Sequence, residues 1–314
     1  MKAYIPNYPS HAGHWIYKGY QLAWAKLGYD MITVPSDETV TMTMARTCAP
    51  ITNEQLKEDY IIMMIDALVN EKVLEAIDKS HKTFVFAQPN TFPQPWGSHP
   101  NFQCLASDKI INILNQMDNV YLWTFGDDTS GHTKWKKEVH TVPLAFDSLA
   151  YRPIIDENYS KYDICFVGGW VNNGFNEKRK IMIKYFSEFM KSGLNCGFFV
   201  NKNISQEQEN ALLYNSKISL NIHDAYQRIL GYDTSERTFK SLGLNGILLS
   251  DKVGQLERIF PNVKTTMEPS EMVRITREYL SLSEKELNDV KEENRQNVLD
   301  NHCYIHRVEQ LLAL

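Results

Sequence analysis

Apolar runs with strand character alternate with helical stretches along the whole 314-residue chain. Tyr60–Asp66 (YIIMMID) consists almost entirely of bulky apolar side chains, which is typical of a strand buried on both faces of a parallel sheet. A helical pattern over Val73–Lys79 follows, and then a second apolar run at Thr83–Gln88. Because alternating strands and helices form parallel sheets covered by helices, this order predicts an α/β fold.

A polar break near residues 143–160 divides this pattern into two series of strands and helices. Domains commonly hold about 100–200 residues, so two are expected. We predict a Rossmann-like N-terminal domain over residues 1–150 and a Rossmann-like C-terminal domain over residues 151–314. Glu284–Leu312 is predicted to be a long closing helix, and Ser283 with Glu286 has the spacing of a capping box at its start.

The composition is that of an ordinary globular protein, with 43% apolar and 23% charged residues. No run approaches the roughly 20 apolar residues that span a bilayer, and the N-terminus lacks the apolar core of a signal peptide, so we expect a cytoplasmic protein without a membrane span. The five cysteines include no CxxC spacing, which favours reduced thiols over disulfides or a zinc site. Residues 1–150 hold 12 Lys and Arg against 16 Asp and Glu, which argues against strong nucleic-acid binding.

The loop after the predicted strand Tyr162–Val167 begins with Gly168 and Gly169. Paired glycines let backbone amides approach a phosphate closely. Lys178 and Arg179 follow at the start of the next predicted helix, where a cation, with Arg179 as the candidate, could reach the same phosphate. A tight turn followed by a solvated basic helix end would give the same pattern.

The segment Asp233–Phe239 (DTSERTF) has a second phosphate-binding pattern. Thr234 and Ser235 are good N-cap residues, so a helix is predicted to start directly after them. Free amides, a guanidinium and a hydroxyl in one helical turn suit a diphosphate, although a capped helix with a surface arginine would look the same. The residues of that first turn would be Glu236, Arg237 and Thr238.

Together these C-terminal motifs resemble group-one glycosyltransferases, and within them the spore-maturation-protein type. SERTFKSLGLNGILLSD, at the end of Tyr214–Asp251, is similar to the pattern RxFEaxaxGgxllsd of those proteins. VPLAFDSLAYRP resembles their interdomain segment, YDICFVGGW their first C-domain strand and glycine turn, and NHCYIHRVEQLL their closing helix. The similarity covers roughly residues 140–314.

This resemblance implies two Rossmann-like domains facing across a cleft, which is the GT-B architecture. It implies an enzyme that moves a sugar from a nucleotide diphosphate donor, expected to be a UDP-sugar, to a hydroxyl acceptor. Arg237 and Thr238 match positions that face the donor phosphates. The chain has no DxD motif, so no metal cofactor is expected.

The chain departs from the family at the pair of acidic residues of which the second binds the donor ribose. Lys240 stands where relatives have the second of these, and Arg228 stands where the first would fall. Glu236 is near but out of register. The resemblance therefore does not imply ribose recognition by that pair. His223, at the end of the predicted strand Lys217–Ile222, could contact the donor sugar or diphosphate, or could serve the fold alone.

An enzyme that inverts the anomeric centre needs a base to deprotonate the acceptor hydroxyl, and histidine suits this near neutral pH. His11 and His14 lie in the predicted first loop, Asn7–Gly19, where the glycines at 13 and 19 would let it close over substrate. Asp66, at the end of the YIIMMID strand, is the rival base. Each of the three could instead serve only to hydrogen-bond the backbone.

Other functions remain open at this stage. An NAD-dependent dehydrogenase is disfavoured because the first strand is not followed by GxGxxG. A non-catalytic protein that binds nucleotide sugars is an alternative from another class. Among enzymes, a phage-type glycosyltransferase acting on a hydroxymethylated DNA base is the second candidate. The acceptor could be a saccharide, a protein, a small molecule or a modified DNA base.

Overall fold

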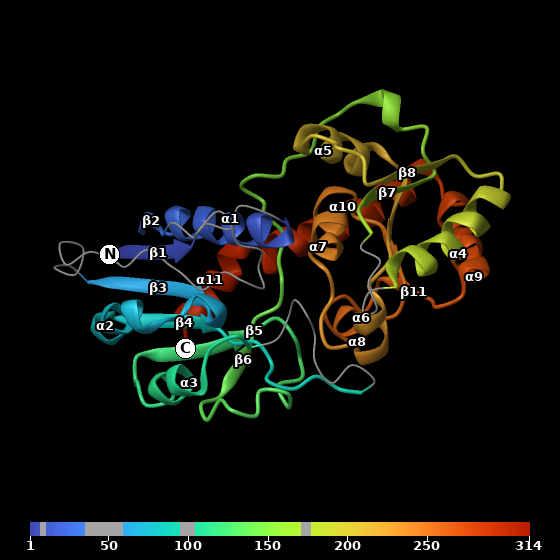
Figure 1. Cartoon of the computed structure of the whole chain (residues 1–314). Helices are drawn as coiled ribbons and strands as arrows, with labels where there is room; N and C mark the ends of the chain where they lie inside the picture. Colours follow the sequence, from blue (N-terminus) through green and yellow to red (C-terminus); the bar gives the residue numbers. More distant parts are fainter. Residues whose placement is uncertain (7–10, 35–58, 95–103, 171–176) are drawn as a thin grey trace. The chain divides into compact units, whose positions relative to one another are not determined.

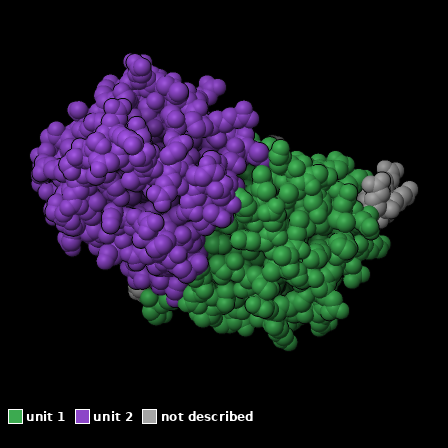
Figure 2. All heavy atoms as spheres, turned by 180° about the vertical axis from the view of Figure 1, so that it is seen from behind, with its two compact units in different colours: residues 1–143, 304–314 green, residues 144–303 purple. Residues whose placement is uncertain are grey.

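The structure is a computed structural model that describes residues 1–6, 11–34, 59–94, 104–170 and 177–314. The chain forms two compact units, one of Met1–Pro143 with Tyr304–Leu314 and one of Leu144–Cys303 (Figures 1 and 2). Each unit contains one parallel sheet covered by helices, so the predicted α/β class with two Rossmann-like sheets is confirmed.

The sheet of the first unit has six parallel strands in the order β2-β1-β3-β4-β5-β6. In the centre, Tyr4 pairs with Ile32 on one side and with Ile62 on the other. Every residue of β3 is buried, as the uninterrupted apolar run predicts. The strands are β1 (Lys2–Pro6), β2 (Asp30–Val34), β3 (Tyr60–Ile65), β4 (Lys82–Phe86), β5 (Val120–Thr124) and β6 (Val139–Thr141).

The helices of this unit cover the two faces of the sheet. Asn70 and Ser107 cap the second and third helices by accepting backbone hydrogen bonds, which stabilises their first turns. A short 3₁₀ turn, Asp66–Leu68, follows β3 directly. The α-helices are α1 (His11–Lys26), α2 (Glu71–Lys79), α3 (Asp108–Leu114) and the C-terminal α11 (Tyr304–Leu312).

Helix α1 corrects the predicted first loop, because the backbone is helical from His11 onward and not only from Tyr17. The glycines suggested a flexible segment, but Gly19 has a packing role. A Cβ atom at residue 19 would lie 2.4 Å from the ring of Tyr304 in α11. The missing side chain therefore lets α1 and α11 pack closely, and the prediction of a loop that closes over substrate was wrong for residues 11–19.

The sheet of the second unit has five parallel strands in the order β11-β10-β9-β7-β8. They are β7 (Ile164–Gly168), β8 (Cys196–Val200), β9 (Ile218–Asn221), β10 (Leu248–Ser250) and β11 (Lys264–Thr265). The helices are α4 (Lys178–Lys191), α5 (Gln206–Asn215), α6 (Ala225–Leu230), α7 (Glu236–Leu244), α8 (Gly254–Ile259), α9 (Pro269–Leu280) and α10 (Glu284–Asn301), with a 3₁₀ turn at Glu157–Tyr159. The six-residue α6 was not predicted. No helix in the described ranges is both long and apolar enough to cross a membrane.

The predicted closing helix Glu284–Leu312 is in fact two helices. The capping box at Ser283 and Glu286 is present, as predicted. The helix then breaks at His302 and Cys303, because the backbone N–H of Phe146 donates to the His302 carbonyl at 2.8 Å and Phe146 forms a β-bridge with Cys303. Sequence periodicity could not reveal a break caused by a segment more than 150 residues away.

Gly246 ends α7 at a point where α10 approaches closely. Its φ is +86°, and a Cβ atom there would lie 2.1 Å from the backbone oxygen of Lys291. Gly193 has a similar φ of +76°, but a Cβ there would meet nothing within 4 Å. The two glycines therefore separate the cost of a left-handed backbone from the cost of a steric clash.

We predict that Gly246→Ala lowers the free energy of unfolding by about 2–4 kcal/mol, since it combines backbone strain with overpacking against the main chain of α10. Gly193→Ala should cost only about 1 kcal/mol, the backbone contribution alone. Urea denaturation of both variants provides the measurement. Equal losses would show that the approach of α10 at Gly246 is looser than the structure has it.

Candidate functional site

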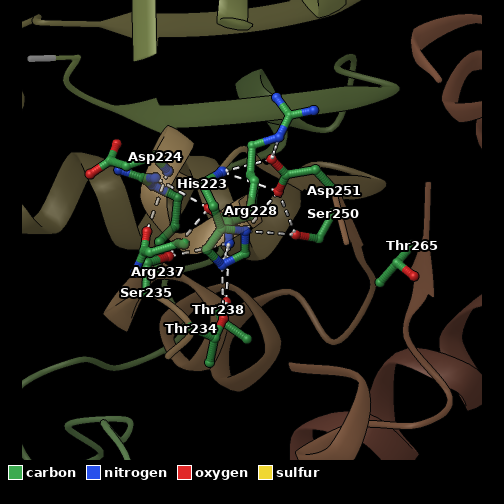
Figure 3. A network of polar contacts seen from close by, with 12 residues as sticks. His223, Asp224, Arg228, Thr234, Ser235, Arg237, Thr238, Ser250, Asp251 and Thr265 are labelled. Carbon is green, nitrogen blue, oxygen red and sulfur yellow. Dashed lines mark hydrogen bonds and ion pairs between the residues drawn. The ribbon is translucent and has the colours of Figure 1, made fainter. Parts of the chain in front are cut away.

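The densest polar network of the second unit lies in the loops that follow β7, β9 and β10 (Figure 3). Parallel sheets bind their ligands at the carboxyl ends of strands, where helix N-termini and turns converge. Three predicted site residues, His223, Arg237 and Thr238, meet in this network. It is therefore the candidate functional site.

A fully buried carboxylate, Asp251, anchors the network. His223 Nδ1 donates to Asp251 Oδ1 at 2.6 Å, and Arg228 Nε lies 3.3 Å from Asp251 Oδ2. The backbone N–H of His223 also donates to both carboxylate oxygens, at 3.1 Å each. Burial acts to raise the pKa of Asp251, but His223 and Arg228 outweigh it and hold the pKa below its ordinary value.

His223 is completely buried, and both of its ring nitrogens have protein partners. Nδ1 donates to the Asp251 carboxylate, and Nε2 lies 2.8 Å from the hydroxyl oxygen of Thr234, within hydrogen-bond distance. Figure 3 shows the ring between Asp251 and the pair Thr234 and Thr238. From its place at a strand end, His223 was predicted either to contact the sugar or diphosphate of the donor substrate or to serve the fold alone. The structure shows that a direct contact would require exchange of one of these hydrogen bonds.

From Thr234 the network continues to the arginine of α7. The hydroxyls of Thr234 and Thr238 lie 2.6 Å apart, and Asn221 Nδ2 donates to Thr238 Oγ1 at 3.0 Å. Asn221 Oδ1 in turn accepts from Arg237 Nη1 at 3.2 Å. A continuous chain of hydrogen bonds therefore links the guanidinium to the buried carboxylate of Asp251.

Arg237 is a partly buried cation that is held by neutral groups. Its Nε donates to the Val167 carbonyl at 2.9 Å, and its guanidinium lies 4.8 Å from the ring centroid of Phe166. Among the described residues no carboxylate lies within ion-pair distance of it, and Nη2 has no protein acceptor. Burial lowers the pKa of Arg237, but an arginine stays protonated. A fixed positive charge without an ion-pair partner among the described residues suits an anionic ligand.

The glycine turn lies directly against this guanidinium. A Cβ atom at residue 168 would stand 2.2 Å from Arg237 Nη2, so the guanidinium can keep this place only beside a glycine. In the part of the chain that the structure describes, the N–H of Gly169 donates to no protein acceptor. An open amide and an open guanidinium nitrogen therefore lie on adjacent loops, as the sequence pattern predicts for a phosphate site.

Helix α7 begins at Glu236, as predicted, with Ser235 as its N-cap. The Ser235 side chain does not cap the helix but contacts the Asn221 side chain amide, at 3.2 Å from Nδ2. Within the described residues, the N–H groups of Glu236 and Arg237 have no acceptor. The N-terminus of α7, which is the positive end of its dipole, is thus open on a loop adjacent to the glycine turn.

Lys178 and Arg179 have opposite environments at the start of α4. Lys178 is buried and pairs with Asp224 at 3.0 Å, and its burial lowers its pKa. Arg179, the residue that the sequence analysis selected, is exposed and lies 5.7 Å from the Trp170 ring centroid. Of these two predicted cations, Lys178 is therefore the buried one that lies near the network.

Lys240 stands at the position where the resembled family has a glutamate, and its ammonium group is held by partners within the protein. Its Nζ lies 2.8 Å from Glu209 and 3.8 Å from Glu236, and 5.2 Å from the ring centroid of Tyr151. Burial acts to lower the pKa of Lys240, but the two carboxylates outweigh it and raise it. Glu236 therefore sits one helical turn from a cation, at the start of α7.

The candidate bases lie in the first unit. His11 begins α1, but its side chain is outside the described residues. His14 is partly buried, with its ring 5.0 Å from that of Trp15. Asp66 is fully buried, and its Oδ2 accepts from the Gln88 N–H at 2.6 Å. Burial raises the pKa of Asp66 to about 7, close to the value that suits a general base.

Comparison with protein families identifies the second unit. Residues 168–313, which contain the whole network, match the family model described as Glycosyl transferase-like. The second unit is therefore a glycosyltransferase-like domain. No curated protein sequence matches the chain.

Solved structures of glycosyltransferases share the fold along the whole chain. The UDP-forming α,α-trehalose-phosphate synthase from Burkholderia vietnamiensis has a TM-score of 0.58 and 8% identity, covering 100% of this chain and 99% of its own. AviGT4, a glycosyltransferase of avilamycin A biosynthesis, has a TM-score of 0.57 and 11% identity, with 100% and 96% covered. BGT of T4 phage, solved with its UDP-glucose substrate, has a TM-score of 0.50 and 11% identity, with 100% of both chains covered.

These similarities confirm the GT-B fold class. They do not favour the two alternatives. The family model describes transferases, against a non-catalytic binding protein. The similarity to the phage enzyme has a lower TM-score than the other two, so the fold gives no preference for a phage-type acceptor.

We predict that Asp251→Asn lowers the free energy of unfolding at pH 7 by roughly 3 kcal/mol, because the buried Arg228 loses its counterion. The pKa of Asp251 is depressed, so its contribution is present above the ordinary aspartate value of about 4 and is lost as the pH falls through the folded-state pKa. Urea denaturation of wild type and variant should therefore differ less at pH 3 than at pH 7. Glu75→Gln, which removes an exposed pair with Lys79, is the control and should leave stability almost unchanged. A pH-independent difference would contradict the prediction.

Proposed function

We propose that this glycosyltransferase uses a UDP-sugar and binds the UDP diphosphate between the Gly168-Gly169 turn and the N-terminus of α7. The observation that carries the proposal is Arg237, a fixed cation with no carboxylate partner among the described residues and with Nη2 against Gly168. The open amides of Gly169, Glu236 and Arg237 add donors on adjacent loops. Enzymes of the same fold include a UDP-forming synthase and two proteins solved with UDP-2-fluoro glucose or UDP-glucose, which supports the choice of base.

We propose different roles for the other residues that were predicted to bind the nucleotide-sugar donor. Thr238 and His223 hold the chain that orients Arg237, and Arg179 lies at the exposed edge of the glycine turn. Glu236, with its carboxylate 3.8 Å from Lys240, offers acceptors to donor hydroxyls. The order of the C-terminal motifs supports the spore-maturation-protein type within the group-one enzymes, and the saccharide, protein, small-molecule and DNA-base classes of acceptor remain to be tested.

Arg237→Ala is expected to weaken UDP binding by roughly 1.5–3 kcal/mol, the range for a charge-assisted hydrogen bond. Gly168→Ala should weaken it as well, since the added Cβ displaces Nη2 without removing the charge. Arg277→Ala, which removes an exposed arginine of α9, is the matched control. Calorimetric titration with UDP gives the affinities, and an unchanged affinity in Arg237→Ala would disprove the assignment.

The proposed enzyme is expected to work without a metal ion. Arg237 and the open helix amides place positive charge where a leaving diphosphate develops its negative charge, which is the role that a metal plays elsewhere. Activity with a UDP-sugar donor should therefore survive EDTA. Complete loss that Mn²⁺ or Mg²⁺ restores would show that a metal is required.

For the base we propose a histidine at the start of α1, His11 ahead of His14, on an acceptor domain formed by residues 1–150. His11→Ala should lower kcat by about 10²–10⁴-fold and leave UDP affinity unchanged, since the donor is bound by the other unit. Asp66, with a pKa of about 7, would titrate in the same range, so a pH profile alone does not separate the candidates. The profile is therefore measured for His11→Ala, His14→Ala and Asp66→Asn. Near-wild-type kcat in both histidine variants with a loss in Asp66→Asn would transfer the role to Asp66.

A further inference from the structure

Asn201, the residue that follows β8, has an unusual backbone conformation for its position. Its φ is +50°, and only one other non-glycine residue in the described ranges, Glu177 with φ +40°, has a positive φ. Both lie at the glycine-turn end of β7 and β8, since Gly168 pairs with Val200 and Glu177 is the N-cap of α4. Left-handed conformations at non-glycine residues concentrate where a structure holds a functional geometry.

Asn201 braces the glycine turn, in the sense that it forms hydrogen bonds with the residues on both sides of Gly169. Its backbone N–H donates to the Gly168 carbonyl at 2.9 Å, and its side-chain Oδ1 accepts from the Trp170 N–H at 3.2 Å. Gly169 lies between the two braced residues. A Cβ atom at residue 169 would stand 2.9 Å from Asn201 Oδ1, so the brace also requires glycine there.

The side chain is exposed, so burial in the core does not explain its presence. Three properties are combined at this position. The backbone needs a residue that tolerates the left-handed region, which favours glycine, asparagine and aspartate. The Trp170 N–H needs a side-chain acceptor, which excludes glycine. A neighbouring anion needs a neutral side chain, which excludes aspartate and leaves asparagine.

We propose that Asn201 is a positioning residue that aims the Gly169 N–H at the donor diphosphate. It touches the turn and not the ligand, and it acts by fixing the peptide units on either side of Gly169. This inference rests on the proposed binding of UDP at the glycine turn. It adds a residue that follows β8 to a site otherwise built from the loops after β7, β9 and β10.

The test compares the affinities of UDP and of uridine, which lacks both phosphates. Asn201→Gly keeps the backbone conformation and removes the acceptor, so the UDP affinity should fall roughly 3–10-fold while uridine is unaffected. Asn201→Asp keeps both the acceptor and the conformation but adds a negative charge, so the UDP affinity should fall by at least as much, and less so in high salt. Asn203→Gly, at an exposed asparagine two residues on, is the matched control.

A purely structural role would lower the thermal midpoint and leave the ratio of UDP to uridine affinity unchanged. Ratios within twofold of wild type in both Asn201 variants, with Arg237→Ala still weakening UDP, would overturn the inference and leave the proposed function standing. Failure of the wild-type protein to bind UDP at all would overturn both. If Asn201→Gly does not fold, Asn201→Ala, which also removes the side-chain acceptor, takes its place in the comparison.

Discussion

The contact between Asp251 and His223 joins the end of β10 to the loop after β9, and the geometry of the candidate site depends on it. A carboxylate with no exposed surface needs charged or hydrogen-bonding partners, and here they come from the His223 ring, its backbone N–H and Arg228. The His223 ring is fixed as a result. Its second nitrogen then sets the hydroxyl of Thr234, and through it the chain that ends at Arg237. Arg237 is thus oriented by a residue that it does not touch.

The buried and partly buried cations of the second unit have different partners, and these differences set Arg237 apart from the others. Lys178, Arg228 and Lys240 each have a carboxylate partner. Lys291 is bound only to the Ser216 carbonyl, and its burial lowers its pKa to about 7, so it can lose its charge. Arg237 cannot deprotonate, and its partners are a carbonyl and an amide oxygen. It therefore keeps a positive charge that the described part of the protein leaves for a ligand.

The sequence predicted what depends on local pattern. The β3 run, the α7 start at Glu236 and the Ser283 capping box follow from the spacing of apolar and capping residues, and the structure confirms them. Three-dimensional partners could not be predicted in this way. The helix break at His302 depends on Phe146, which is distant in the sequence.

The same limit explains the errors within the site. Lys178 and Arg179 are neighbours in the sequence, but adjacent positions on a helix differ by about 100°, so one is buried and the other exposed. Asp251 and Asn221 carried no signal of their own, because an acid or an amide at a strand end is common. Their importance appears only when three strands bring their ends together. A sharper signal was available at Gly19, where a glycine inside a helical apolar pattern marks close packing as often as it marks a loop.

Lys240 changes which hydrogen-bonding groups the protein can offer to a nucleotide-sugar donor. An ammonium can only donate, and its partners Glu209 and Glu236 occupy it within the protein, so residue 240 cannot supply the carboxylate oxygens that relatives have there. The nearest acidic group on the same helix is Glu236, four residues earlier, or about 6 Å closer to the N-terminus of α7. Burial raises the pKa of Glu236, while the helix dipole and Lys240 one turn later favour its ionised form. If the sugar donor binds as proposed, with its diphosphate at the glycine turn, it would meet the carboxylate oxygens of Glu236 beside that diphosphate and not one helical turn further along α7.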